Sequence, residues 1–191
     1  MSFTAALMGI SAGSTQITQT ENLGPPCASA KAGNSIHMEL SEILHPEAVK
    51  AFGKLTSKKR LFLDLGEVAG ACYGLEVNSA VNALQDRESL GPTGVGHGVA
   101  LPHARIEGLD RVVGAFFRLD TPLDFDAVDR QPVDLIFALF APAESGVDHL
   151  KALALVSRTM RDPDTCTKLR SNADATTLHA ILTAGPVIKA A

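Results

Sequence analysis

Val133-Asp-Leu-Ile-Phe-Ala-Leu-Phe140 is almost entirely apolar and shows no alternation of apolar and polar residues. A second run of this kind extends from Arg111 to Leu119. A strand with one face in water alternates, whereas a strand covered on both faces is apolar almost throughout. Both runs therefore predict strands in the middle of a sheet. We expect an α/β fold, with a central mixed β-sheet and helices on both faces (an α/β/α sandwich).

Helices are predicted in the segments that precede these strands. Ser57 is a good N-cap for a helix that stops at Gly74, and a second helix begins near Val77 and carries Arg87 in its last turn. Earlier in the chain, a proline suits the first position of a helix over 47–52. For the helix that begins after Ser57, the predicted buried stripe consists of Leu61, Leu65, Val68 and Cys72.

Three more helices are predicted after the second apolar run. Ser145-Gly-Val-Asp148 has the pattern of a capping box, and His149 falls in the first turn of the helix that follows. Shorter helices are expected from Pro163 to Leu169 and over 174–182. For the helix that follows Ser145, the predicted buried stripe consists of Leu150, Leu153, Ala154, Ser157 and Met160.

The first 37 residues differ in composition from the rest of the chain. They are rich in Ser, Thr, Gly, Ala and Gln, and their only charged residues are Glu21 and Lys31. Such a segment buries too little apolar surface to offset the entropy lost when it becomes ordered. We expect residues 1–37 to be a flexible leader or an expression remnant, and residues 38–186 to form one domain.

Charge and cysteine content exclude several classes of function. The net charge is −4 and the only basic run is Lys58-Lys59-Arg60, which disfavours a surface that binds nucleic-acid phosphates. Cys27, Cys72 and Cys166 form no C-x-x-C pair, which argues against a disulfide framework or a thiolate zinc site. No apolar run approaches the roughly 18 to 20 residues of a membrane-spanning helix. The sequence predicts a cytoplasmic protein with no cofactor, no nucleic-acid partner and no membrane insertion.

Thr93-Gly-Val-Gly-His-Gly-Val-Ala-Leu-Pro-His-Ala-Arg105 concentrates glycines, histidines and an arginine. Residues 99–101 predict a short buried strand that Pro102 ends, so His103 is expected where the chain leaves the sheet, a common position for functional residues. The alternating glycines suit a sharp bend, or backbone N–H groups open to an anion. The candidate anion-binding positions of this segment are Gly96, His97 and Gly98.

His103 and His149 are the histidines best placed to act together, because each follows a predicted strand of the same sheet. Zinc binding lacks further ligands at a suitable spacing, and Ser-His-Asp hydrolysis lacks a G-x-S-x-G elbow. A neutral imidazole can instead accept a phosphoryl group, whose charge Arg87 and the helix after Ser145 could offset. From residue types alone, a half-buried packing role for His149 and surface roles for Arg87 and Arg105 stay open.

Several motifs together resemble a known family. They are Gly94-Val-Gly-His-Gly-Val-Ala-Leu-Pro-His-Ala-Arg105, Arg87-Glu88, Phe125 to Phe140, and His149-Leu-Lys-Ala-Leu153. In their order along the chain and in their spacing, they resemble the enzyme IIA domain of the phosphoenolpyruvate phosphotransferase system, fructose/mannitol class. Within that class the chain is most similar to the nitrogen-related enzyme IIA. The resemblance runs from about Met38 to Ala184.

The resemblance implies a phosphotransferase component that forms a phosphohistidine intermediate. It implies that His103 accepts the phosphoryl group from an HPr-like carrier, that His149 holds the phosphate or orients His103, and that Arg87 contacts the phosphate or the partner. Arg105 and the glycine segment are further candidates for this contact. One departure is His97, which stands where family members often have Asn.

Three functions follow from these observations as alternatives. The first is a regulator whose phosphorylation state changes its binding to other proteins, such as potassium transporters or sensor kinases, as the resemblance implies. The second is a sugar-specific enzyme IIA that passes phosphate to a IIB domain. The third is a binding module that holds a small anion without chemistry. A metalloenzyme is a weaker possibility, because no set of metal ligands stands out.

Overall fold

A six-stranded mixed sheet organises the protein in a computed structural model that describes residues 38–144 and 146–184. The predicted leader, residues 1–37, lies outside the described residues. The strands are β1 (Leu44–Lys54), β2 (Gly94–Gly96), β3 (Val99–Ala100), β4 (His103–Ile106), β5 (Val113–Leu123) and β6 (Val133–Pro142). The helices are α1 (Leu40–Ile43), α2 (Lys58–Tyr73), α3 (Val77–Ser89), α4 (Val147–Arg161), α5 (Pro163–Arg170) and α6 (Ala175–Thr183).

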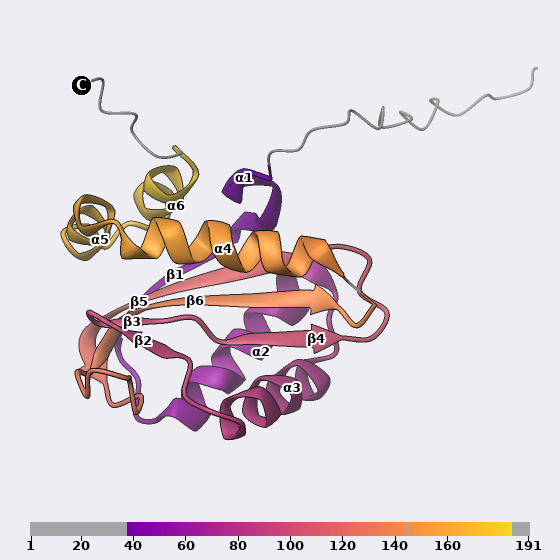
Figure 1. Ribbon diagram of the computed structural model, residues 1–191. Coiled ribbons are helices and arrows are strands. Elements are labelled where there is room, and N and C mark those ends of the chain that lie inside the picture. Colours follow the sequence, from indigo (N-terminus) through magenta and orange to yellow (C-terminus); the bar gives the residue numbers. More distant parts are fainter. Residues whose placement is uncertain (1–37, 145, 185–191) are drawn as a thin grey trace, which may run out of the picture. The chain divides into compact units, whose positions relative to one another are not determined.

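The two apolar runs form the centre of this sheet, as predicted. The strand order is β1-β5-β6-β3-β2, and β4 pairs with β6 beyond the end of β3. β5 and β6 are antiparallel, whereas β1 runs parallel to β5, and β3 and β4 run parallel to β6. Helices α2 and α3 cover one face of the sheet and α4 crosses the other (Figure 1). The predicted mixed sheet with helices on both faces is confirmed.

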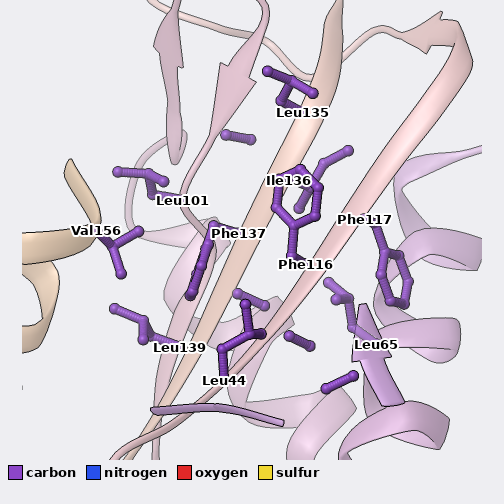
Figure 2. Close-up of a cluster of buried hydrophobic side chains, with 14 of the residues drawn as sticks. Leu44, Leu65, Leu101, Phe116, Phe117, Leu135, Ile136, Phe137, Leu139 and Val156 are labelled. Carbon is purple, nitrogen blue, oxygen red and sulfur yellow. The ribbon is translucent and has the colours of Figure 1, made fainter. Parts of the chain in front are cut away.

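The core lies between the helices and the two central strands. Phe116 of β5 is paired with Phe137 of β6, and both side chains are fully buried. Figure 2 shows Leu65 of α2 and Val156 of α4 on opposite sides of these strands. Burial of each such side chain contributes roughly 1.5 to 3 kcal/mol. No helix of the described residues is both long and apolar enough to cross a bilayer.

The predicted boundaries of α2 are confirmed by its caps. The Ser57 side chain accepts a hydrogen bond from the backbone N–H of Arg60 over 3.2 Å. At the other end Gly74 has φ +71°, a left-handed conformation that glycine adopts without a steric penalty. Within the predicted stripe, Leu61 and Leu65 are buried, while Val68 and Cys72 are only half-buried at its margin.

The predicted helix over 47–52 is wrong, because this segment is part of strand β1. Pro46 lies in the edge strand of the sheet, where its missing N–H removes no ladder bond from a central strand. Ala48 and Val49 are adjacent and both buried, and the pairing with β5 shifts register between Leu44 and Val49. This irregularity hides the period of two that marks a strand in sequence.

The predicted buried stripe of α4 is also wrong. Its buried residues are His149, Ala152, Val156 and Met160, so the stripe shares only Met160 with the prediction, and Leu150 is 63% exposed. Apolar residues occur around most of this helix, so the sequence pattern does not single out the face that packs on the sheet. The N-cap is Gly146, with no side-chain cap, and the predicted cap Ser145 lies outside the described residues.

Candidate active site

His103 is the first residue of β4 and is fixed by two hydrogen bonds to its ring. Nδ1 lies 3.0 Å from the carbonyl oxygen of Leu101, and Nε2 lies 3.0 Å from Nε of Arg87. A carbonyl only accepts and a guanidinium only donates, so both contacts require the same neutral tautomer, with the proton on Nδ1. The lone pair of His103 is therefore on Nε2.

The chain does not leave the sheet at His103, contrary to the prediction. Pro102 interrupts the pairing for Leu101 and Pro102 only, and the chain resumes beside β6 with His103 opposite Leu139. The carbonyl of Pro102 accepts a hydrogen bond from the N–H of Leu139 over 2.9 Å. His103 is thus held by backbone pairing on a rigid strand, which fixes the position of its ring.

His149 lies beside His103, as the sequence predicted. It belongs to the first turn of α4, and the centroids of the two imidazoles are 5.8 Å apart at an interplanar angle of 44°. The residue is only 7% exposed, and its Nδ1 has no hydrogen-bond partner among the residues that the structure describes. A buried polar atom without a partner is costly, which favours a ligand at this position.

A cavity of about 420 Å³ joins these histidines to two arginines. Arg87 reaches it from the last turn of α3, where its Nη1 also donates to the carbonyl of Gly91 over 3.1 Å. Arg105 reaches it from β4 and donates to the carbonyl of Ala143, just before α4. The full lining consists of Ala83, Asp86, Arg87, His103, Ala104, Arg105 and His149. Two guanidinium groups and two imidazoles suit a phosphate-sized anion.

The predicted glycine positions do not line this cavity. Val99 pairs with Leu135 and His103 with Leu139, so the two positions are separated by four residues of extended chain, about 13 Å. The tight turn between β2 and β3, which holds Gly96, His97 and Gly98, precedes that stretch.

Other residues hold the turn. His97, with φ +55°, donates its N–H to Asp129, and its carbonyl accepts from Arg170, which also pairs with Asp134. The structure therefore places the glycine segment in a separate, structural network.

Burial makes both histidines harder to protonate. Burial lowers the pKa of His103, with the Arg87 charge acting in the same direction and the Leu101 carbonyl and Glu88 opposing it. Burial lowers the pKa of His149 as well, and the nearby His103 and Arg105 lower it further. Both imidazoles are therefore neutral near neutral pH, and a neutral imidazole nitrogen is a competent nucleophile.

The chain matches the family model described as "Phosphoenolpyruvate-dependent sugar phosphotransferase system, EIIA 2" over residues 42–185. It belongs to this EIIA family. A nitrogen regulatory protein of Bradyrhizobium diazoefficiens is 41% identical over 153 residues, covering 80% of this chain and all of the relative. The nitrogen regulatory protein of Escherichia coli is 38% identical over 151 residues, covering 78% of this chain and 93% of that protein.

The fold is shared with solved EIIA structures. The crystal structure of the nitrogen regulatory protein IIA-Ntr from Neisseria meningitidis superposes with a TM-score of 0.71 at 35% identity. The superposition covers 75% of this chain and 99% of the Neisseria chain. The resemblance inferred from the sequence is thus confirmed at the level of the EIIA family.

Sequence reasoning missed part of this candidate site. Ala83 and Asp86 line the cavity, and with Arg87 they follow the i, i+3, i+4 spacing of one helix face, a signal that could have found them. Glu88 was also missed as a support. It accepts from Lys58 Nζ over 3.1 Å and from Thr93 N and Oγ1 over 3.1 and 2.6 Å. These bonds fasten the end of α3, and hence Arg87, to neighbouring elements.

Proposed function

We propose that this protein is a phosphoryl-accepting regulator in which Nε2 of His103 takes the group from a phosphohistidine of an HPr-like carrier. One observation carries the proposal: the neutral ring of His103 lines a cavity together with His149 and two arginines, and the lone pair of its Nε2 is the candidate nucleophile. The names of the nitrogen regulatory relatives support a regulatory outcome. The phosphorylation state of His103 would then set which proteins bind this one.

The transfer step balances without a cofactor. The lone pair of Nε2 forms the new N–P bond while the N–P bond of the carrier breaks, and the carrier imidazole keeps that electron pair. The His103 ring becomes a phosphoimidazolium that keeps its proton on Nδ1, where the N–H continues to donate to the Leu101 carbonyl. Exchange between two phosphohistidines needs little driving force, so catalysis is mostly positioning.

Neighbouring donors stabilise the charge that the phosphoryl oxygens carry. Arg87 must first leave the Nε2 lone pair that it covers, and its N–H groups can then donate to phosphoryl oxygens. Nδ1 of His149, which has no partner among the described residues, can donate to another oxygen in the tautomer that carries its proton there.

Phosphorylation by a carrier tests the proposal directly. The full chain is incubated with the phosphorylated carrier, and we expect one acid-labile, base-stable phosphate per molecule. His103→Ala should abolish the label. His97→Asn is the matched control, because position 97 lies outside the cavity and Asn tolerates its positive φ. Equal labelling of His103→Ala and the parent contradicts the proposal, as does reversible phosphate binding with no covalent product.

A sugar-specific role is the second candidate, because the matched family is described as part of a sugar phosphotransferase system. In that role phosphorylated His103 would pass its group to the cysteine of a IIB domain. A panel of purified IIB domains added to the phosphorylated protein separates the two functions. Rapid loss of the label to one IIB domain favours sugar transport. Retention of the label across the panel favours regulation.

The regulatory proposal also carries a location and a class of target. We place the protein in the cytoplasm, a compartment that suits the free thiols of Cys72 and Cys166. Potassium transporters and sensor kinases are the proposed targets. Affinity measurements with and without phosphorylation of His103 test each of them.

A further inference from the structure

A second group of chemically active side chains lies between β1 and the last turn of α2. It consists of His45, Glu47 and Cys72, whose nitrogen, oxygen and sulfur donor atoms all lie within 4.8 Å of one another. His45 and Glu47 are exposed and Cys72 is half-buried. None of the three lines the His103 cavity, so this cluster stands apart from the proposed phosphoryl site.

The backbone around the cluster is fixed by Tyr73. Its hydroxyl accepts a hydrogen bond from the N–H of His45 over 2.9 Å and donates to the carbonyl of Gly114 over 2.7 Å. The rings of His45 and Tyr73 meet edge to face, with centroids 6.5 Å apart. Tyr73 is the neighbour of Cys72, so these contacts tie the end of α2 to β1. Two of the donors are thereby held close before any ligand arrives.

We propose that His45, Glu47 and Cys72 bind a divalent transition-metal ion of the zinc class. A thiolate, an imidazole and a carboxylate together match the ligand set of Zn²⁺ or Co²⁺, whereas Mg²⁺ and Ca²⁺ prefer oxygen donors only. Tetrahedral bonds to these atoms require donor separations of about 3.3 to 3.6 Å. Because the donor atoms lie within 4.8 Å of one another, the exposed His45 and Glu47 side chains have to close up to about 1.5 Å, which a change of rotamer allows.

Binding has a defined proton balance. Burial raises the pKa of the Cys72 thiol, Glu47 raises it further and Lys50 opposes them, so the metal-free protein carries the proton on sulfur near neutral pH. The metal–sulfur bond therefore releases one proton to solvent. His45 gives up only a long hydrogen bond of 3.3 Å from the Glu47 N–H to its Nδ1. The fourth coordination position remains open to water.

Co²⁺ added to the full-length, untagged chain tests the site. We expect a thiolate-to-cobalt charge-transfer absorption that saturates at one equivalent and is abolished by Zn²⁺. Tyr73 is the only tyrosine and the chain has no tryptophan, so intrinsic fluorescence reports from beside the site and should be quenched in parallel.

Two variants and one control make the test specific. Cys72→Ser should remove the absorption, and His45→Ala should weaken binding at least about tenfold. His45 is exposed and Cys72 is half-buried, so circular dichroism is used to verify that both variants fold. Cys27→Ser is the matched control and should bind as the parent does. The proposal is overturned if the parent shows no thiolate band, or if the band survives Cys72→Ser.

Discussion

Arg87 donates from Nε to Nε2 of His103 over 3.0 Å, and this contact covers the nitrogen that would attack phosphorus. The Leu101 carbonyl holds the other end of the ring, so the imidazole is kept in one tautomer and one orientation. An arginine in this position can serve two states in turn. It orients the free ring, and it can bind the phosphoryl oxygens once the new bond forms.

Arg87→Gln should slow phosphorylation of His103 on the order of 100-fold, because a fixed cationic donor to the transferring group is lost. Pulse labelling by the phosphorylated carrier measures the rate. The same change removes a positive charge that lowers the pKa of His103, so an NMR titration should show that pKa rising. Arg158→Gln, on an exposed position of α4, is the control and should leave both quantities unchanged. A parent-like rate in Arg87→Gln contradicts the assigned role.

Acid should destabilise the protein through its two site histidines. The pKa values of His103 and His149 are lowered in the folded state, so the unfolded chain binds more protons as the pH falls below the ordinary value of 6.5. Stability is therefore unaffected by these groups above that pH and is lost progressively below it. Thermal unfolding across this range measures the loss, and His149→Gln should make it shallower. An equal acid loss in His149→Gln would falsify this origin.

The central strands could be predicted because a strand that is buried on both faces has a continuous apolar sequence, such as the run that ends at Phe140. β1 could not, because its irregular pairing places Ala48 and Val49 side by side in the core. Pro46 gives the same sequence signal at a helix start and in an edge strand. Only the long-range pairing of β1 with β5 decides between them.

The candidate site, too, could be predicted only in part from the sequence. His103 and His149 meet as predicted, but for a different reason: His103 begins β4 opposite Leu139 of β6, and α4 follows β6. The separation of His97 from His103 depends on how far the chain stays extended, and Pro102 suggests an exit from the sheet where the strand in fact resumes. The support from Glu88 joins α2, the end of α3 and the loop before β2, and its contact with Lys58 spans 30 residues and so leaves no local pattern.

Glu88→Ala should destabilise the fold by about 1 to 3 kcal/mol, because Thr93 loses its carboxylate acceptor and Lys58 loses the less exposed of its two carboxylate partners. Lys58 keeps the carbonyl of Phe125 and the exposed Asp126. Urea unfolding measures the change. Asp126→Asn provides the comparison: Asp126 also pairs with Lys58, but its side chain is 80% exposed, so the loss should stay below about 0.5 kcal/mol. Equal losses in the two variants would mean that burial of Glu88 does not matter.

Leu150→Asp should weaken productive contact with the carrier while leaving the fold intact. Leu150 and Val147 are 63% and 64% exposed in the first turn of α4, the turn that buries His149 beside His103. Exposed apolar side chains in the same helical turn as His149, which lines the cavity, suit a transient protein contact. We expect the KM for the phosphorylated carrier to rise about tenfold, equivalent to about 1.4 kcal/mol, with little change in kcat.

Val128→Asp is the matched control for this surface. Val128 is 71% exposed, but it lies beside Gly94 and Gly96, away from the cavity. The same new charge there should leave the KM for the carrier unchanged, and thermal unfolding should show both variants as stable as the parent. If both variants raise KM equally, the effect comes from net charge, which steers association at long range. A rise confined to Leu150→Asp instead places the docking contact on the first turn of α4, the turn that carries His149.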